Sequence, residues 1–288
     1  MTRLTPALLA LLGCQNDQRI GKVGYDHVAV VAGDFDEFEA VLGRNGMTYT
    51  AYEGFISQPT YDPELRTSDF DKSSESLFRD LTDEGVSMLM NYDAVFLNSG
   101  SRGFGHTVYN GVHADDDLVT DANVRDHVEA YVQDGRQLVV SDWGYDLIEA
   151  VWPDAISFLW EDEGLDNAQR GKSGDLRATV TDSALARALG TDEVLLSYDF
   201  SHWAVIESVS SDVTVYMRGD VRATPDDAEL GDVKLVDVPL LVGVPVNGGE
   251  LIFSTFHWRS QHDSVGNALL ETLVGRLKTE PQEAQVNE

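Results

Sequence analysis

Hydrophobic runs and helical periodicities alternate along the first half of the chain. Short β-branched or apolar runs predict strands, and positions repeating every three to four residues predict amphipathic helices. The predicted strands are 25–31, 47–53, 91–100 and 137–141, and the predicted helices are 34–46, 74–90, 121–134 and 145–151. Asp121 is a suitable N-cap for the third helix. Strands that alternate with helices predict a mostly parallel, flavodoxin-like sheet with helices on both faces.

The pattern changes from about residue 155. Short strand-like runs (VLLSYDF, WAVIESV, DVTVYMRG and DVKLVDV) follow one another between Ser, Asp and Gly, with one predicted helix at 183–189. We therefore expect an inserted β-rich region at about 155–238 within a domain spanning 25–278. The runs 240–246 and 251–256, joined by Asn247, Gly248 and Gly249, predict a hairpin, and a helix is expected at 264–277. Residues 279–288 form a polar tail.

The amino terminus has the pattern of an export signal. One cationic residue, Arg3, precedes an uncharged stretch that ends in Leu11-Leu12-Gly13-Cys14. The stretch is shorter than the roughly 20 apolar residues that a membrane-spanning helix needs. Its end resembles a bacterial lipobox, which predicts a signal peptide at 1–13, acylation of Cys14 and a short tether at 14–24. The alternative is an amphipathic start with a buried cysteine.

Cys14 is the single cysteine of the chain, so it has no internal disulfide partner. Acyl chains on the thiol and on the freed amine would supply the two anchors that stable membrane attachment requires. The expected location is therefore the cell envelope, lipid-anchored to a bacterial membrane, with the outer membrane as the expected one.

Composition narrows the classes of partner. The 288 residues are 42% hydrophobic, enough for a large core, and 50 acidic against 20 basic residues give a formal net charge of −30. This charge repels phosphate backbones, which argues against nucleic acid as a partner. We interpret the acidity as a solvated surface suited to salt, in preference to a cation-binding store.

Three stretches together resemble the class I glutamine amidotransferase-like superfamily: YDAVFLNSG, GRQLVVSDWGYDLIEAV and GGELIFSTFHWRSQ. In catalytic members of that superfamily, the second stretch carries a cysteine nucleophile at a strand-to-helix elbow, and the third carries a histidine followed two places later by glutamate. Here His257 stands at the histidine position, Arg259 replaces the glutamate, and the cysteine position falls on Asp142 or Trp143. The resemblance therefore implies the fold without the thiol on which glutamine hydrolysis depends.

Asp142, Trp143, His257 and Trp258 are the candidate ligand-binding residues, because the carboxyl ends of parallel strands are where open α/β sheets bind ligands. Aromatic rings beside carboxylates suit sugar or peptidoglycan recognition. The alternative for Asp142 is a helix cap, the alternative for His257 is a hydrogen-bonded core or rim residue, and the alternative for the two tryptophans is buried packing.

Two further ligand classes are weakly supported. His257, His262 and Asp263, with His113 and Asp115–Asp117, do not follow a known zinc spacing, so no metal site is predicted. The glycines at 100–105 lack the order of a dinucleotide-binding loop, and no cofactor is expected. The leading hypothesis is a non-catalytic envelope lipoprotein with a binding or scaffold domain and a glycan or protein partner. The alternative is a hydrolase of a sugar or amide that uses Asp142 and His257.

The charge leads to a prediction about salt. Like charges closer than a Debye length of about 8 to 10 Å repel one another more in the compact state than in the unfolded chain, so screening should stabilise the fold. The melting temperature should rise with chloride concentration, equally for sodium and potassium salts. A flat response to both salts, combined with a sharp shift at low calcium that a chelator reverses, would contradict the solvated-surface interpretation.

Overall fold

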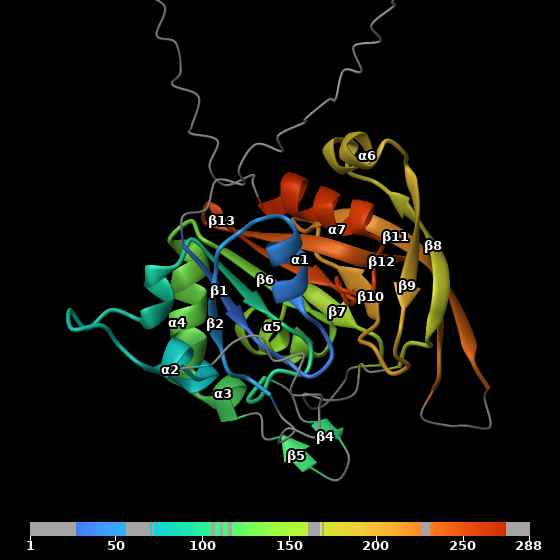
Figure 1. Cartoon of the computed structure of the whole chain (residues 1–288). Coiled ribbons are helices and arrows are strands. Elements are labelled where there is room, and N and C mark those ends of the chain that lie inside the picture. Colours follow the sequence, from blue (N-terminus) through green and yellow to red (C-terminus); the bar gives the residue numbers. More distant parts are fainter. Residues whose placement is uncertain are drawn as a thin grey trace, which may run out of the picture.

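The structure, a computed structural model, describes residues 27–55, 70, 72–104, 107–109, 112–114, 117–160, 168, 170–225 and 231–274. The predicted signal peptide, Cys14, the tether and the polar tail lie outside the described residues. Figure 1 shows a central twisted sheet with helices packed on both of its faces.

The core of the molecule is a parallel sheet. Its strands are β1 (Val28–Val31), β2 (Thr50–Tyr52), β3 (Ala94–Leu97), β6 (Gln137–Ser141) and β13 (Gly249–Ser254), in the spatial order β2-β1-β3-β6-β13. Every neighbouring pair among them is parallel. Renumbered by their place in the chain, the strands follow the order 2-1-3-4-5 of doubly wound flavodoxin-like sheets.

Two hydrophobic layers cover this sheet. Val28 and Val30 of β1 face the layer that includes α1 (Phe38–Arg44), α6 (Ser183–Leu189), α7 (Asp263–Leu269) and the helical turn Leu270–Val274. Ala29 and Val31 face the opposite layer, formed with α2 (Ser74–Arg79), α3 (Asp117–Thr120), α4 (Ala122–Gln133) and α5 (Tyr145–Val151). The core strands are buried on both faces, which explains why they read as continuous apolar runs.

Antiparallel strands extend the sheet beyond β13. They are β12 (Val233–Val246), β11 (Thr214–Ala223), β8 (Gly174–Val180) and β9 (Glu193–Tyr198), which complete a sheet of nine strands. Two small antiparallel pairs form separate two-stranded sheets: β7 (Ile156–Phe158) with β10 (Ile206–Val209), and β4 (Thr107–Tyr109) with β5 (Val112–Ala114). The β-rich region is therefore largely an extension of the core sheet. The boundary expected at residue 238 falls inside β12, because buried residues continue along that strand through Val244.

Local sequence signals placed most elements correctly. β6, α5 and α6 have the predicted bounds, and the hairpin of β12 and β13 is confirmed. Asp121 caps α4, accepting a hydrogen bond from the Asn123 amide at 2.9 Å.

The predicted helix 74–90 is wrong, because α2 ends at Arg79 and a separate 3₁₀ turn covers Met88–Asn91. Gly85 between them has a φ of 77°, which a helix cannot accommodate, and Leu81 pairs with Ser87 across the resulting turn.

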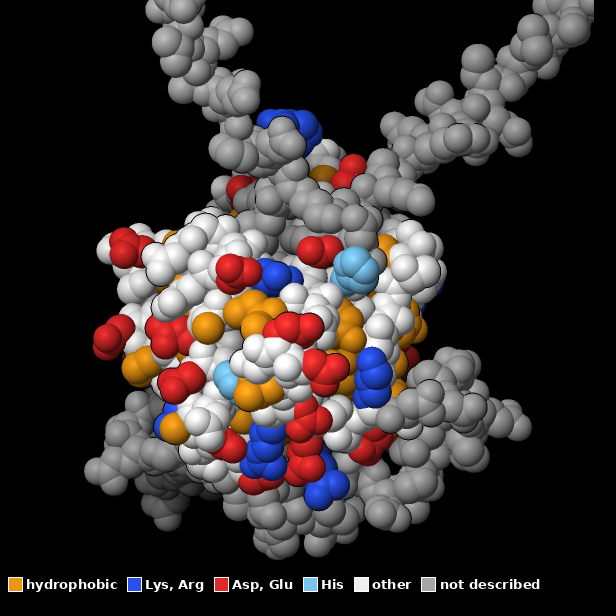
Figure 2. Space-filling model, turned by 90° about the vertical axis from the view of Figure 1, so that its left-hand side faces the viewer, with side chains coloured by type: hydrophobic (Ala, Val, Ile, Leu, Met, Phe, Trp, Pro, Cys, Tyr) orange, Lys and Arg blue, Asp and Glu red, His pale blue; other side chains and the backbone are white. Residues whose placement is uncertain are grey.

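Two observations relate to the predictions about surface charge and about membrane-spanning helices. Figure 2 shows the face over α2 and α4, where acidic side chains are scattered among basic, polar and hydrophobic ones instead of gathering in one patch. Among the described helices, none is long and apolar enough to cross a bilayer.

Two glycines provide a matched test of the packing. A Cβ atom at Gly249 would lie 2.0 Å from the Val132 carbonyl oxygen and 2.5 Å from that of Arg136, whereas a Cβ atom at Gly43 in α1 would meet nothing within 4 Å. Gly249→Ala should lower the free energy of unfolding by about 3 kcal/mol, because backbone atoms cannot move aside cheaply. Gly43→Ala should raise it by about 0.5 to 1 kcal/mol. Denaturant titration measures both, and equal effects of the two changes would contradict the packing at β13.

Candidate functional site

The site is built on the sharp turn that follows β6. The strand ends at Ser141, Asp142 adopts a φ of 41°, and a 3₁₀ turn over Asp142–Gly144 leads into α5. A Cβ atom at Gly144 would lie 2.5 Å from a Val140 methyl group, so the turn is too tight for a side chain there. Aspartate tolerates a positive φ better than most residues. Of the two positions that the sequence left open for the cysteine, Asp142 is the one that contacts His257.

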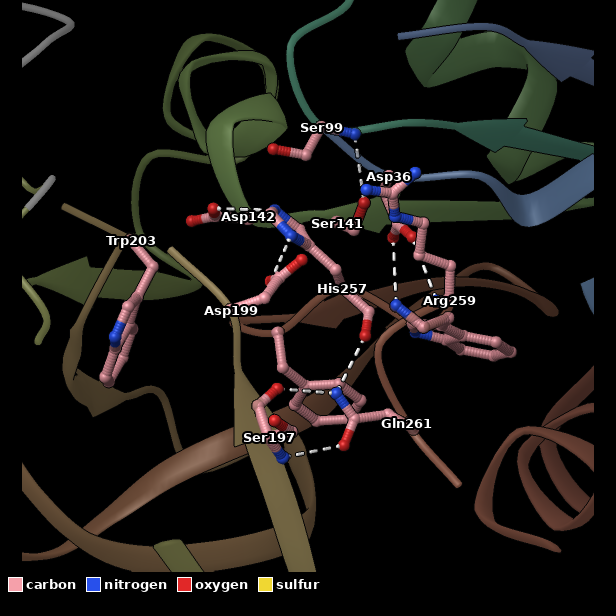
Figure 3. A network of polar contacts seen from close by, with 12 residues as sticks. Asp36, Ser99, Ser141, Asp142, Ser197, Asp199, Trp203, His257, Arg259 and Gln261 are labelled. Atoms are coloured by element: carbon pink, nitrogen blue, oxygen red, sulfur yellow. Dashed lines mark hydrogen bonds and ion pairs between the residues drawn. The ribbon is translucent and has the colours of Figure 1, made fainter. Parts of the chain in front are cut away.

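His257 lies between two carboxyl groups (Figure 3). Its Nε2 atom is 3.2 Å from Asp142 Oδ2, and its Nδ1 atom is 2.8 Å from Asp199 Oδ1. The second Asp142 oxygen, Oδ1, accepts a hydrogen bond from the Ala204 amide at 2.7 Å. Asp142 is 2% exposed and His257 is 3% exposed. Both ring nitrogens of His257 and both carboxyl oxygens of Asp142 are therefore engaged inside the protein.

Asp199 is an acidic partner of His257 that the sequence did not predict: because Arg259 stands where catalytic members of the superfamily have glutamate, no acidic partner was expected. Asp199 directly follows β9 in the antiparallel extension. It contacts His257 Nδ1, a contact that Arg259, two places after His257, does not make. Arg259, which occupies that place, directs its guanidinium to Glu37 Oε1 at 2.6 Å. The only sequence signal for Asp199 was its position at the end of the predicted strand VLLSYDF.

The two carboxyl groups determine the charge of the imidazole. Burial alone would lower the pKa of His257, but its hydrogen bonds to Asp142 and Asp199 and the negative charge of Asp36 raise that pKa to about 10. Burial raises the pKa of the Asp142 carboxyl, while His257 and the Ala204 amide oppose that rise. Burial also acts to raise the pKa of Asp199, but the His257 contact outweighs it and the pKa is lowered. At neutral pH the site therefore holds a protonated imidazole with both N–H groups donating.

The backbone amides around the elbow are also occupied. The Trp143 amide donates to Ser99 Oγ at 3.3 Å, and the Ser99 amide donates to Ser141 Oγ at 3.0 Å. In strand-to-helix elbows, the amide after the nucleophile is one of the donors that stabilise an oxyanion. Here that donor already has a serine partner.

A second buried carboxylate fixes the backbone after His257. Asp36 is 1% exposed and accepts hydrogen bonds from the amides of Glu37, Trp258 and Arg259 at 2.8, 3.0 and 3.1 Å. It thus ties the start of the α1 region to the turn after β13.

The two aromatic candidates lie in different surroundings: Trp258 is in the hydrophobic core, and Trp143 is at the rim of the site. Trp258 is 0% exposed, packs edge-on against Phe38 and donates to Ser254 Oγ, so it presents no surface to a ligand. Trp143 is half-buried, donates to the His202 carbonyl and contacts Phe35 at 4.6 Å between ring centroids. Phe200, which sequence reasoning missed, is 41% exposed and contacts both Phe35 and the His257 ring.

The described side chains do not support a metal site built from the histidines and aspartates that the sequence analysis considered. Within the described part of the chain, no three His, Cys, Asp or Glu residues come together in a way that could hold a metal ion. His262 caps α7 through Ser264, Asp263 pairs with Arg44, and Asp117 pairs with Arg79. The side chains of His113, Asp115 and Asp116 lie outside the described residues.

Comparisons with known proteins support the fold and no further detail. No protein-family model matches the chain, and no curated protein matches its sequence. The structure is similar to PurLQS from Thermotoga maritima, with 11% identity over 86% of this chain and 97% of that one, at a TM-score of 0.50. It is also similar to a ThuA-like protein from Bacteroides uniformis (13% identity, 85% and 88% coverage, TM-score 0.46). A third similar structure is that of a glutamine amidotransferase from Thermotoga maritima (9% identity, 85% of this chain and 80% of that one, TM-score 0.40).

At these identities the likeness is one of fold alone. The chain has an α/β fold with a parallel core sheet and an antiparallel extension, similar to the class I glutamine amidotransferase-like fold.

Proposed function

We propose that this protein is a non-catalytic, lipid-anchored component of the bacterial cell envelope, in which an amidotransferase-like domain binds a partner or serves as a scaffold. One observation carries the proposal: the groups that an elbow enzyme would use are already paired with one another. The Asp142 carboxyl, both His257 nitrogens and the Trp143 amide each have a protein partner.

Catalysis would require these groups in other states. A general base needs a neutral imidazole nitrogen within reach of a proton on the substrate. With a pKa of about 10, His257 is protonated at neutral pH. Glutamine hydrolysis would also need a thiolate, and the single cysteine, Cys14, lies far from the elbow in sequence. The trio of Asp142, His257 and Asp199 instead joins β6, β13 and the antiparallel extension into one unit.

The rim above the trio is the surface that supports binding. Phe200 is exposed beside half-buried Trp143, and Asp199 places a partly exposed carboxylate next to them. Flat apolar rings beside hydrogen-bond acceptors suit the faces and hydroxyl groups of sugars. An envelope glycan is therefore the partner that this rim fits best, with an envelope protein as the second choice.

A hydrolase remains the second candidate, and Asp199 is the observation that favours it. A histidine oriented by one carboxylate and facing another at a strained elbow has the arrangement of a nucleophile, a base and an orienting acid. Such an enzyme would act through Asp142 on a sugar or amide substrate. The burial of Asp142 and the serine on the Trp143 amide argue against it.

Enzyme assays distinguish the two candidates. Purified protein should release no ammonia from glutamine and hydrolyse no nitrophenyl glycoside or ester above the uncatalysed rate, and Asp142→Asn should behave like the wild type. His257→Ala is the companion variant, with thermal unfolding to confirm that each variant is folded. Turnover by the wild type that both substitutions abolish in folded protein would establish the hydrolase instead.

Attachment through Cys14 gives an independent prediction. The LLGC sequence implies acylation of that thiol, and two or more acyl chains hold a protein firmly on a membrane. Wild-type protein should incorporate labelled palmitate and sediment with membranes, whereas Cys14→Ser should be unlabelled and leave the membrane fraction. Unchanged sedimentation and processing of Cys14→Ser would refute the lipoprotein proposal while leaving the proposal about the site intact.

A further inference from the structure

We propose that a slot in the antiparallel extension, away from the His257 site, binds a small organic carboxylate. The slot lies where β8 and β11 part. The two strands pair through Met217, Arg218 and Gly219. Beyond Gly219, β11 pairs instead with residues 170–172, through the Lys172 amide and a bridge between Gly171 and Ala223. This change of partner leaves a cavity of about 150 Å³, lined in part by Lys172, Ser173, Leu176, Trp203, Val221 and Arg222.

The inner wall of the slot is apolar and fixed in place. Trp203 is 2% exposed, and its indole N–H donates to the Lys172 carbonyl at 2.9 Å. A Cβ atom at Gly171 would lie 2.0 Å from the indole ring, so the backbone packs directly against it. Val221 is buried beside it, and Leu176 packs against the same core. A ligand entering the slot therefore meets a preformed apolar wall.

The mouth of the slot carries a cation, Arg222, with which no described residue forms an ion pair. Lys172 pairs with Asp232 at 3.3 Å, and Asp220 pairs with Lys234 at 2.7 Å. Arg222, by contrast, has no ion pair and no side-chain hydrogen bond with any described residue, although acidic residues outnumber basic ones 50 to 20 in the chain. Because no carboxylate of a described residue pairs with it, the Arg222 guanidinium at the mouth of the cavity is available to a ligand.

The surrounding charges select the type of anion. A guanidinium matches a planar carboxylate with two parallel hydrogen bonds. The exposed ion pair of Lys172 with Asp232 is weak in water and can exchange one anion for another, which offers a second contact. Asp175 and Asp220 also line the slot and would repel a doubly charged phosphate or sulfate. A singly charged carboxylate with a small apolar body against Trp203 satisfies all of these features.

The slot is linked through the backbone to the trio of Asp142, His257 and Asp199. The Ala204 amide, next to Trp203 in the chain, donates to Asp142, and the His202 carbonyl accepts from Trp143. The proposal does not depend on whether the trio is catalytic, because the slot uses none of its groups.

Calorimetric titration at constant ionic strength tests the slot. Acetate is the probe, and acetamide, its neutral isostere, is the ligand control. Acetate should give saturable binding to the wild-type protein and acetamide none. Arg222→Ala should weaken acetate binding by about tenfold or more, since the bidentate contact is lost. Arg187→Ala removes an exposed arginine from α6 at the same cost in net charge and should bind acetate like the wild type.

Thermal unfolding of each variant confirms that it is folded. Absence of saturable acetate binding to the wild type would overturn the proposal. Equal binding of acetate and acetamide would do the same, because the carboxylate would then play no part. Equal weakening by Arg222→Ala and Arg187→Ala would also overturn it, by reducing the effect to net charge. None of these results bears on the function proposed for the His257 site.

Discussion

A protonated imidazole held between two carboxyl groups is the contact on which the rest of the site depends. Burying ions is costly unless each one is paired and hydrogen-bonded, and removing one partner from such a group typically costs about 3 to 5 kcal/mol. Here the three members come from the elbow after β6, the turn after β13 and the end of β9. The relative positions of the parallel core and the antiparallel extension are therefore coupled to the charge of one histidine.

The same contact engages most of the polar groups around the elbow. Asp142 at the elbow and Asp199 beyond β9 both hydrogen-bond the imidazole, and these contacts raise the pKa of His257. The Ser99 hydroxyl accepts from the Trp143 amide at the turn, the Ser141 hydroxyl accepts from the Ser99 amide, and Asp36 fixes the backbone after His257. Each of these polar groups is satisfied internally, which leaves Phe200, Trp143 and Asp199 at the rim in reach of solvent.

The sequence predicted the parts of the structure that local patterns determine. The apolar run of β6, the helical spacing of α5 and α6 and the cap at Asp121 depend on neighbouring residues, so their bounds could be read from the chain. Asp142 and His257 could be brought together because both follow core strands at the same edge of the sheet.

Other features depend on contacts between distant residues. Asp199 lies 58 positions from His257, and nothing near either residue indicates their contact. The burial of Trp258 follows from its packing against Phe38 of α1, which is far away in the sequence. The continuation of β12 through residue 238 reflects its pairing with β11 and β13, and the slot beside Arg222 arises where β11 changes partners.

A measurement of the protonation state of His257 is the most direct test of a closed site, one in which Asp142 and Asp199 hold a protonated imidazole between them. Nitrogen-detected NMR of the folded protein, with the resonances assigned by comparison with His257→Gln, reports whether each ring nitrogen carries a proton. Both nitrogens should be protonated at neutral pH, with a titration midpoint near the pKa of about 10 that the two carboxyl groups impose. A neutral ring at pH 7 with one bare nitrogen and a midpoint near the ordinary value of about 6.5 would show that the carboxyl groups do not hold the charge, and would contradict the closed site.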